Sequence, residues 1–174
     1  MGNGFFGYLQ QLEMLAFFSG YALVYLSIRI FCGNQSLKNK PSVKYVSLLP
    51  FAYALIGTLY LGLQIRNLYP DFTMANISHK IPQIYLALWG LLSILFWVPF
   101  FSEKPVLSLL HSLLFFFLIL RDLFFQITGM VSDKNLLQND MRIYSVSLVL
   151  NLAAYIFIFL LNFLEGIRKK HSNS

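Results

Sequence analysis

The sequence has little charge for its length. Asp, Glu, Lys and Arg make up 11% of the 174 residues, whereas hydrophobic residues make up 57%. A soluble domain has about 25% charged and roughly 45–50% apolar residues, and it needs a polar surface to stay dispersed in water. The shortage of charge therefore excludes an ordinary water-soluble globule and indicates that much of the surface faces lipid.

Cysteine and histidine are also scarce, which bears on cofactors. The chain has one cysteine, Cys32, and three histidines. A single thiol cannot form an intrachain disulfide, and a metal site needs clustered His, Cys or carboxylate ligands. A haem inside a bundle is commonly held by axial histidines, but only His111 lies well inside a hydrophobic segment. We therefore expect neither a metal nor another cofactor.

The motifs of common enzymes are missing as well. The sequence contains no Gly-rich phosphate loop, no serine nucleophile elbow and no pair of carboxylates inside an apolar segment, which are the patterns that mark several large enzyme classes. The net charge of +6 comes from residues that flank hydrophobic segments rather than from one basic domain. We therefore expect a protein that is not an enzyme and does not bind nucleic acid.

What the sequence does contain is five long apolar segments. They run approximately over residues 12–32, 43–65, 81–101, 106–128 and 144–164. About 20 apolar residues in a helix cross a hydrocarbon core of roughly 30 Å, so each segment is long enough. The sequence predicts an all-α, polytopic transmembrane bundle that forms a single membrane domain over the whole chain, without a soluble domain.

A count of four spans is the alternative, because polar residues weaken the start of the first segment. They are Gln10, Gln11 and Glu13.

The basic residues between the segments predict an orientation, because Lys and Arg gather on the cytoplasmic side. With five spans, the N-terminus lies outside and the C-terminus in the cytoplasm. The cytoplasmic side then carries Arg29, Lys38, Lys40, Lys44, Lys104, Arg168, Lys169 and Lys170, and the other side carries Arg66, Lys80, Lys134 and Arg142. The richness in Phe, Leu, Ile, Asn and Lys is typical of an AT-rich bacterial genome and suggests a bacterial inner membrane.

The link between the third and fourth segments predicts a tight antiparallel hairpin. Ser102 is a suitable N-cap for the following helix, and Glu103 adds acidic charge in its first turn. Pro105 follows at an early helix position, where proline loses no hydrogen bond.

The fourth segment carries a polar face. His111 and Asp122 are eleven residues apart, which places them within about 20° of each other around a helix. Ser108, Ser112 and Gln126 lie near the same stripe. Such a face is expected to point into protein rather than into lipid.

Two interpretations of this face remain open. In the first, His111 and Asp122 are stations of a proton or ion relay, although roughly 16 Å of helix separates them. In the second, Arg121 and Asp122 make buried polar contacts with a neighbouring helix, and His111 bonds a carbonyl or a serine. Because Arg121 is offset from Asp122 by about 100° around the helix, we expect Arg121 to find its partner elsewhere.

Small and amide residues predict where helices pack. In the fifth segment these are Asn151 and Asn162, and in the second they are Ala54, Thr58 and Gly62, at four-residue spacing. Small residues let helices approach closely in lipid, and amides bond across helices.

Two functions fit these features. The first is a non-catalytic integral membrane subunit that assembles with or stabilises a larger inner-membrane complex, with membrane lipids and other integral membrane subunits as partners in a hetero-oligomer. The alternative is a small transporter or an ion- or proton-conducting channel, possibly homo-oligomeric, that uses the polar face of the fourth segment. A conducting path needs polar residues at several depths on more than one helix, and the interrupted stripe here favours the subunit.

Overall fold

The computed structural model describes residues 14–33, 45–70, 72–73, 77, 84–128 and 134–172. These residues are almost entirely helical, and no strand occurs among them. The all-α prediction is confirmed.

The first two apolar segments form interrupted helices. Residues 14–18 are helical, Ser19 and Gly20 form a turn, and helix α2 then runs over Tyr21–Gly33. Residues 45–47 are helical, Leu48 forms a turn, and α4 covers Leu49–Leu68. Proline stands in the first turn of α4, where its missing N–H has no intrahelical acceptor to lose.

The third segment is divided into short pieces. Helix α6 covers Ile84–Leu91 and continues into a 3₁₀ helix, η1, over Leu92–Trp97. Val98 is extended, and α7 covers Pro99–Ser102. Because Pro99 cannot donate a backbone hydrogen bond, the helix is restarted at this point rather than continued.

Helix α8 covers Pro105–Ile127 and begins at the proline that the sequence indicated. Ser102, which we expected as the N-cap of α8, bonds elsewhere. The Ser102 hydroxyl donates to the carbonyl of Pro99, 3.2 Å away, within α7. Serine in a helix often bonds back to a carbonyl of the preceding turn, so Ser102 belongs to the end of α7.

Helix α9 covers Lys134–Ser172 and is longer than the apolar run that predicted it. Its 39 residues extend over about 58 Å. The polar residues at both ends of the apolar run continue the helix, because many of them are good helix formers that do not need to be buried.

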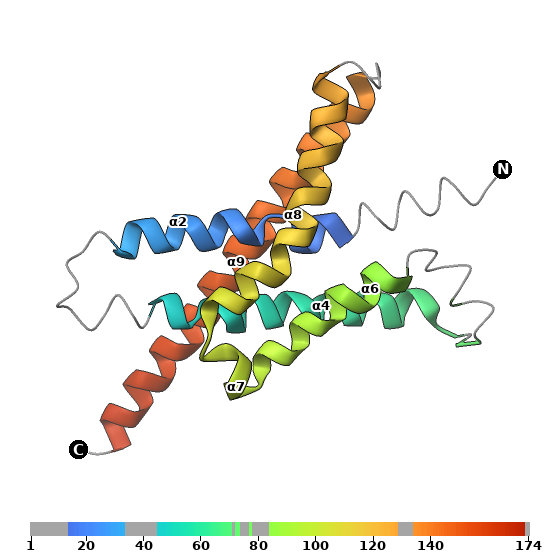
Figure 1. The fold of residues 1–174 in the computed structure, drawn as a ribbon. Helices are drawn as coiled ribbons and strands as arrows, with labels where there is room; N and C mark the ends of the chain where they lie inside the picture. Colours follow the sequence, from blue (N-terminus) through green and yellow to red (C-terminus); the bar gives the residue numbers. More distant parts are fainter. Residues whose placement is uncertain are drawn as a thin grey trace.

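The helices form two groups in space. Helices α2 and α4 run nearly parallel, α6 packs against α4, and the pair α8 and α9 crosses them at a steep angle (Figure 1). The C-terminal end of α9 reaches beyond the other helices, whereas its start lies beside the end of α8 (Figure 1). Aromatic residues fill the centre where the two groups meet. The largest of them are Phe18, Tyr21, Tyr25, Tyr53, Tyr60 and Phe115, each less than 2% exposed.

Four helices of the described chain are long and apolar enough to cross a membrane. They are Met14–Phe31, Tyr45–Leu68, Pro105–Phe125 and Met141–Arg168. The third apolar segment, which we expected to be a further span, is not one of these four. Its described part contains the shorter apolar helix Ile84–Trp97.

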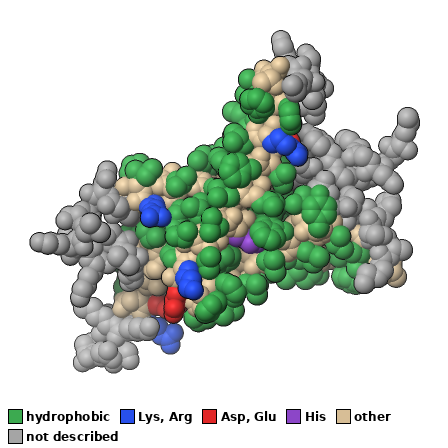
Figure 2. All heavy atoms as spheres, in the orientation of Figure 1, with side chains coloured by type: hydrophobic (Ala, Val, Ile, Leu, Met, Phe, Trp, Pro, Cys, Tyr) green, Lys and Arg blue, Asp and Glu red, His purple; other side chains and the backbone are tan. Residues whose placement is uncertain are grey.

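The surface is hydrophobic over most of its area, as Figure 2 shows for one face. Large apolar side chains are exposed on every long helix, including Phe31 on α2, Leu59 on α4, Phe117 on α8 and Phe157 on α9. Such a surface fits an environment of lipid rather than water.

Candidate functional site

The first group of polar contacts inside the bundle lies at the interruption of the first helix. The last bond of the preceding turn runs from the Ser19 N–H to the Leu15 carbonyl at 3.1 Å, and the next runs from the Val24 N–H to the Gly20 carbonyl at 3.2 Å. Main-chain groups between these two bonds have lost their usual helical partners. In lipid, such groups must be bonded by other parts of the protein.

Helix α9 supplies two of the missing partners. The Gly20 N–H donates to the Ser147 hydroxyl at 2.8 Å, and the Asn151 side-chain amide donates to the Phe17 carbonyl, also at 2.8 Å. One turn separates Ser147 from Asn151, so both side chains face the same helix. The break is therefore stabilised by a matched pair of side chains.

Gly20 is required at this crossing because the two backbones almost touch. A Cβ atom added to Gly20 would lie 2.6 Å from the backbone nitrogen of Leu148 and 2.6 Å from the carbonyl carbon of Ser147. Any side chain would push α9 away and lengthen both hydrogen bonds. Glycine is the residue that permits this approach.

Asn151 is almost fully buried, at 1% exposed. Its amide nitrogen also donates to the Ser147 carbonyl at 2.8 Å. Both acceptors are carbonyl oxygens, so the nitrogen must face them, and this fixes the orientation of the amide. The amide oxygen and the hydroxyl of Tyr144 are buried without a partner among the described residues.

The second constellation surrounds His111 on α8. Its Nδ1 lies 2.8 Å from the hydroxyl of Tyr53 on α4. The indole of Trp89 on α6 stacks on the imidazole, with centroids 4.8 Å apart and an interplanar angle of 3°. The Trp89 Nε1–H donates to the His111 carbonyl at 3.2 Å, and Phe96 approaches the imidazole edge-on. Three elements therefore hold this ring in one orientation.

The serines of α8 bond inward. Ser108 and the hydroxyl of Tyr21 are 2.7 Å apart, and Ser108 also donates to the Pro105 carbonyl. Ser112 donates to the Leu109 carbonyl at 2.8 Å. The polar face of α8 thus meets the aromatic centre of the bundle from Ser108 to Ser112, and its hydroxyls are used in contacts within the chain.

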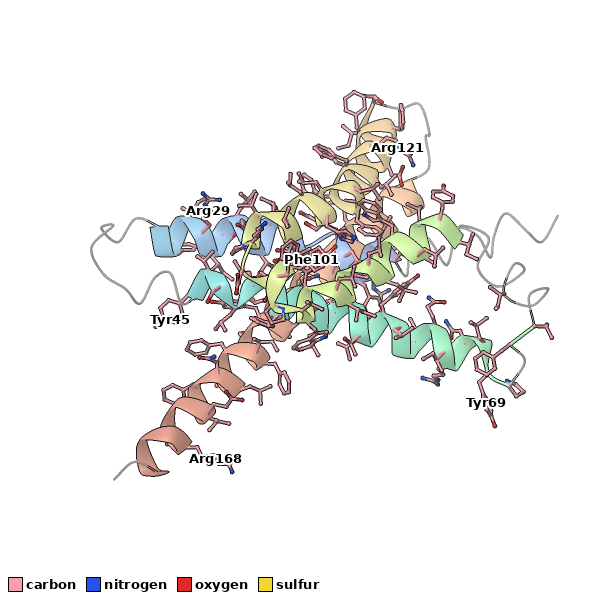
Figure 3. The ribbon with its side chains drawn as sticks, turned by 60° about the horizontal axis from the view of Figure 1, so that its bottom comes forward. Arg29, Tyr45, Tyr69, Phe101, Arg121 and Arg168 are labelled. Atoms are coloured by element: carbon pink, nitrogen blue, oxygen red, sulfur yellow. The ribbon has the colours of Figure 1, made fainter. Side chains whose placement is uncertain are left out.

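The expectation that Arg121 finds its partner elsewhere is wrong. Its Nε and Nη2 donate to one carboxylate oxygen of the adjacent Asp122, at 2.9 and 2.7 Å. The arginine side chain is long enough to bend across the offset between neighbouring residues. The pair lies near the end of α8 that extends beyond α2 and α4 (Figure 3), and Arg121 is 54% exposed.

His111 and Asp122 are therefore not brought together. His111 packs in the aromatic centre, whereas Asp122 pairs with Arg121 at the distant end of the helix. Asn162 lies half-buried on the far part of α9. The side chain of Gln126 lies outside the described residues.

The expected packing face of α4 is only partly used. Ala54 is fully buried. The Thr58 hydroxyl donates to the Ala54 carbonyl at 2.9 Å and accepts a bond from the Trp97 indole at 3.0 Å. A Cβ at Gly62 would meet no atom of the described residues within 4 Å. Gly57 makes the close contact instead, against Ser93 and Ile94 of η1.

Sequence reasoning did not identify Tyr53 and Trp89, which hold His111. Both stand in apolar runs where an aromatic residue is ordinary, so no local signal marks them. Among the residues that the structure describes, no group of three or more His, Cys, Asp or Glu side chains could hold a metal ion.

No family model, curated protein or solved structure matches this chain.

Proposed function

We propose that this chain is a non-catalytic integral membrane subunit that assembles with other membrane subunits and stabilises a larger complex. The observation that carries the proposal is the exposed apolar face along the last part of α9. Ile158 and Phe159 still pack against residues at the start of α4, but the last turns of α9 reach past the other helices (Figure 1). The exposed apolar side chains of this half of α9 lie on one face, which is turned away from α4. They are Ile156, Phe157, Leu160, Leu161, Phe163, Leu164 and Ile167.

The buried polar groups support the same proposal. Ser147, Asn151, Ser108 and His111 each bond a group of another helix of this chain or of their own. Side chains that join helices in pairs stabilise a bundle, whereas a conducting path needs groups that remain available to water or ions.

We also propose five spans, with the N-terminus outside and the C-terminus in the cytoplasm of a bacterial inner membrane. The eight α-helical residues of α6 and the six 3₁₀ residues of η1 together extend about 24 Å, because a 3₁₀ helix rises about 2.0 Å per residue. With Val98 and α7 added, this length approaches the thickness of the hydrocarbon core, about 30 Å.

The distribution of basic residues between the two sides of the membrane supports five spans over four. If the third segment did not cross, the basic residues of the connecting regions would be divided evenly, with six on each side. Five spans give the two-to-one bias described above, which the positive-inside rule favours. The end of α2, the start of α4, α7 and the end of α9 also lie toward one side of the molecule, and the end of α4 and start of α6 toward the other (Figures 1 and 3).

Co-purification tests the proposed role. The tagged chain would be solubilised from its native membrane in a mild detergent, isolated, and analysed by mass spectrometry. We expect other integral membrane polypeptides at a fixed stoichiometry. The double variant Phe157→Ala/Leu164→Ala, which trims the exposed apolar face of α9, should lose them. The matched control is Phe31→Ala, which trims an exposed aromatic residue of α2 and should retain them. Recovery of the chain alone would contradict the proposal.

A small transporter is the second candidate, and the interrupted first helix favours it. Broken helices within the membrane occur where transporters bind substrates and ions. Under this proposal, Asn151→Leu would abolish flux in proteoliposomes while the protein still incorporates and folds. Flux equal to that of empty liposomes for the unaltered chain would remove this candidate.

A further inference from the structure

A groove of about 530 Å³ lies against the last part of α8. Its volume is within the range of roughly 300–1,000 Å³ that is usual for ligand-binding cavities. The described residues that line this α8 groove are Phe117, Leu120, Arg121, Leu123, Phe124 and Ile127. Arg121 is the one charged residue among them, and the others are large and apolar. The groove therefore suits an apolar chain that carries an anionic group.

Arg121 has hydrogen-bond donors to spare for such a group. A guanidinium has five N–H donors, and Arg121 uses one on Nε and one on Nη2 to bind a single oxygen of Asp122. It has no other partner among the described residues, and its side chain is 54% exposed. A phosphate is a suitable acceptor, because two of its oxygens can accept two parallel N–H bonds from one guanidinium.

The depth of Arg121 fits the phosphate of a membrane lipid. Arg121 lies one turn before Phe125, the last residue of the apolar run Pro105–Phe125, and this is about 6 Å along the helix. The long side chain of arginine can cover that distance and reach the headgroups. Leu120 and Phe117 follow on the side that leads into the hydrocarbon core. A lipid held by its phosphate at Arg121 can therefore lay an acyl chain over these two residues.

The size of the lining side chains favours an acyl chain over a helix of another protein. Helices that associate in lipid approach through small residues, and the α8 groove has none among its described lining. The exposed side of α9 around Phe157, by contrast, includes Ala153. A flexible chain can follow the uneven surface between large side chains, whereas a second helix is held away by them.

From these observations we propose that the α8 groove binds an anionic phospholipid with the headgroup chemistry of phosphatidylglycerol. Arg121 donates to the phosphate, and an acyl chain lies over Leu120 and Phe117. Phosphatidylcholine binds less well, because its ammonium group cancels the charge of the phosphate and is repelled by the guanidinium. Asp122 is a positioning residue that holds one edge of the guanidinium. The site does not depend on the assembly proposed for α9.

Native mass spectrometry tests the preference directly. The delipidated full chain would be mixed in mild detergent with equal amounts of phosphatidylglycerol and phosphatidylcholine that carry the same acyl chains. Because a hydrogen bond to a charged group is strong, we expect the first bound lipid to be phosphatidylglycerol with a preference of about tenfold. Equal binding of the two lipids would overturn the proposal.

A charge-neutral substitution tests the role of Arg121. Arg121→Gln/Asp122→Asn removes both charges and leaves the net charge of the chain unchanged, and the preference should fall to about one. The matched control is Arg168→Gln, which removes an exposed arginine of α9 outside the groove and should keep the preference. Loss in Arg168→Gln with retention in the double variant would show that net charge, not the groove, attracts the lipid. Each variant is compared after gel filtration and circular dichroism show a folded protein.

A bulky substitution tests the acyl chain. Leu120→Trp fills part of the groove and keeps Arg121, and the concentration of phosphatidylglycerol at half-saturation should rise about tenfold. Leu110→Trp makes the same change at an exposed position of α8 outside the groove and should have no effect. Unchanged binding in Leu120→Trp, or complete displacement of the lipid by inorganic phosphate, would show that the groove does not hold the chain and would overturn the proposal.

Photo-crosslinking in native membranes identifies the occupant. Benzoylphenylalanine in place of Phe124 should form adducts that are enriched in phosphatidylglycerol relative to the membrane as a whole. An adduct with another polypeptide would overturn the proposal, because a protein would then cover the groove. The same probe in place of Phe157 tests the assembly proposed for α9, so that failure of either proposal is recognised separately.

Discussion

The side-chain amide of Asn151 donates a hydrogen bond to the main-chain carbonyl of Phe17 at 2.8 Å, across 134 residues of sequence. It joins the last long helix to the interrupted first helix. A carbonyl released from a helix inside a membrane has no water to bond, so a side chain of a neighbouring helix must satisfy it. Asn151 thus permits a break that lipid alone would not tolerate.

We expect Gly20→Ala to destabilise the protein by about 1–3 kcal/mol, the usual range for overpacking. The new methyl group would lie 2.6 Å from backbone atoms of α9, and backbone cannot move aside as a side chain can. Thermal unfolding in detergent, followed by fluorescence-detected gel filtration, measures the change.

Gly62→Ala is the matched control, because its methyl group would meet no described atom within 4 Å. In the interior of α4, alanine should be neutral or stabilise by up to about 1 kcal/mol through helix propensity. Equal losses of stability in Gly20→Ala and Gly62→Ala would show that the close approach of Gly20 to α9 does not cause the destabilisation.

Asn151→Leu should lower stability by about 1–2 kcal/mol, because the Phe17 carbonyl would remain buried without its donor. The comparison variant is Asn162→Leu, at a half-buried position of the same helix, where we expect a change within about 0.5 kcal/mol. Urea or SDS unfolding of both purified variants measures the difference. If Asn162→Leu were the more harmful, the proposed role of Asn151 at the break would be wrong.

Arg121→Leu should reduce the amount of protein in the membrane, because it leaves the Asp122 carboxylate without its ion-pair partner. A lone carboxylate in a spanning helix costs up to about 2.5–3.5 kcal/mol. The double variant Arg121→Leu/Asp122→Leu removes both charges and should restore the amount, as measured by quantitative immunoblotting of washed membranes. A double variant no better than the single one would point to a partner other than Asp122.

Single cysteines at Tyr69 and Lys104, in a Cys32→Ser background, test the third span. Tyr69 follows α4 and Lys104 precedes α8, so five spans place them on opposite faces of the membrane. A membrane-impermeant maleimide applied to intact cells should label Tyr69→Cys and leave Lys104→Cys unlabelled until the cells are opened. Labelling of both from one side would show that the segment over α6 and η1 does not cross.

Much of the architecture was predictable from short stretches of sequence. The long apolar runs indicated helices, and Pro105 marked the start of α8, because a proline near the start of a helix breaks no hydrogen bond. The third segment was less predictable. Its composition resembles that of the others, yet it changes to a 3₁₀ helix at Leu92 and bends at Val98, where it packs against α4.

The residues of the candidate sites were also predictable only in part. The sequence singled out His111, Arg121, Asp122 and Asn151, because polar side chains in apolar runs are costly and need partners. It did not indicate that Arg121 pairs with its immediate neighbour, nor that Tyr53 and Trp89 enclose His111. Those partners depend on rotamers and on which helices adjoin, which local patterns do not specify.

The sequence by itself determined that the chain folds into apolar helices, because a helix satisfies its own backbone and the composition leaves no polar surface for water. The tertiary structure alone decided where the first helix breaks and which residues stabilise the break. The physical reason is that the N–H of Gly20 and the carbonyl of Phe17 find their partners on α9, more than 120 residues away, and only the packing of the two helices brings these groups together.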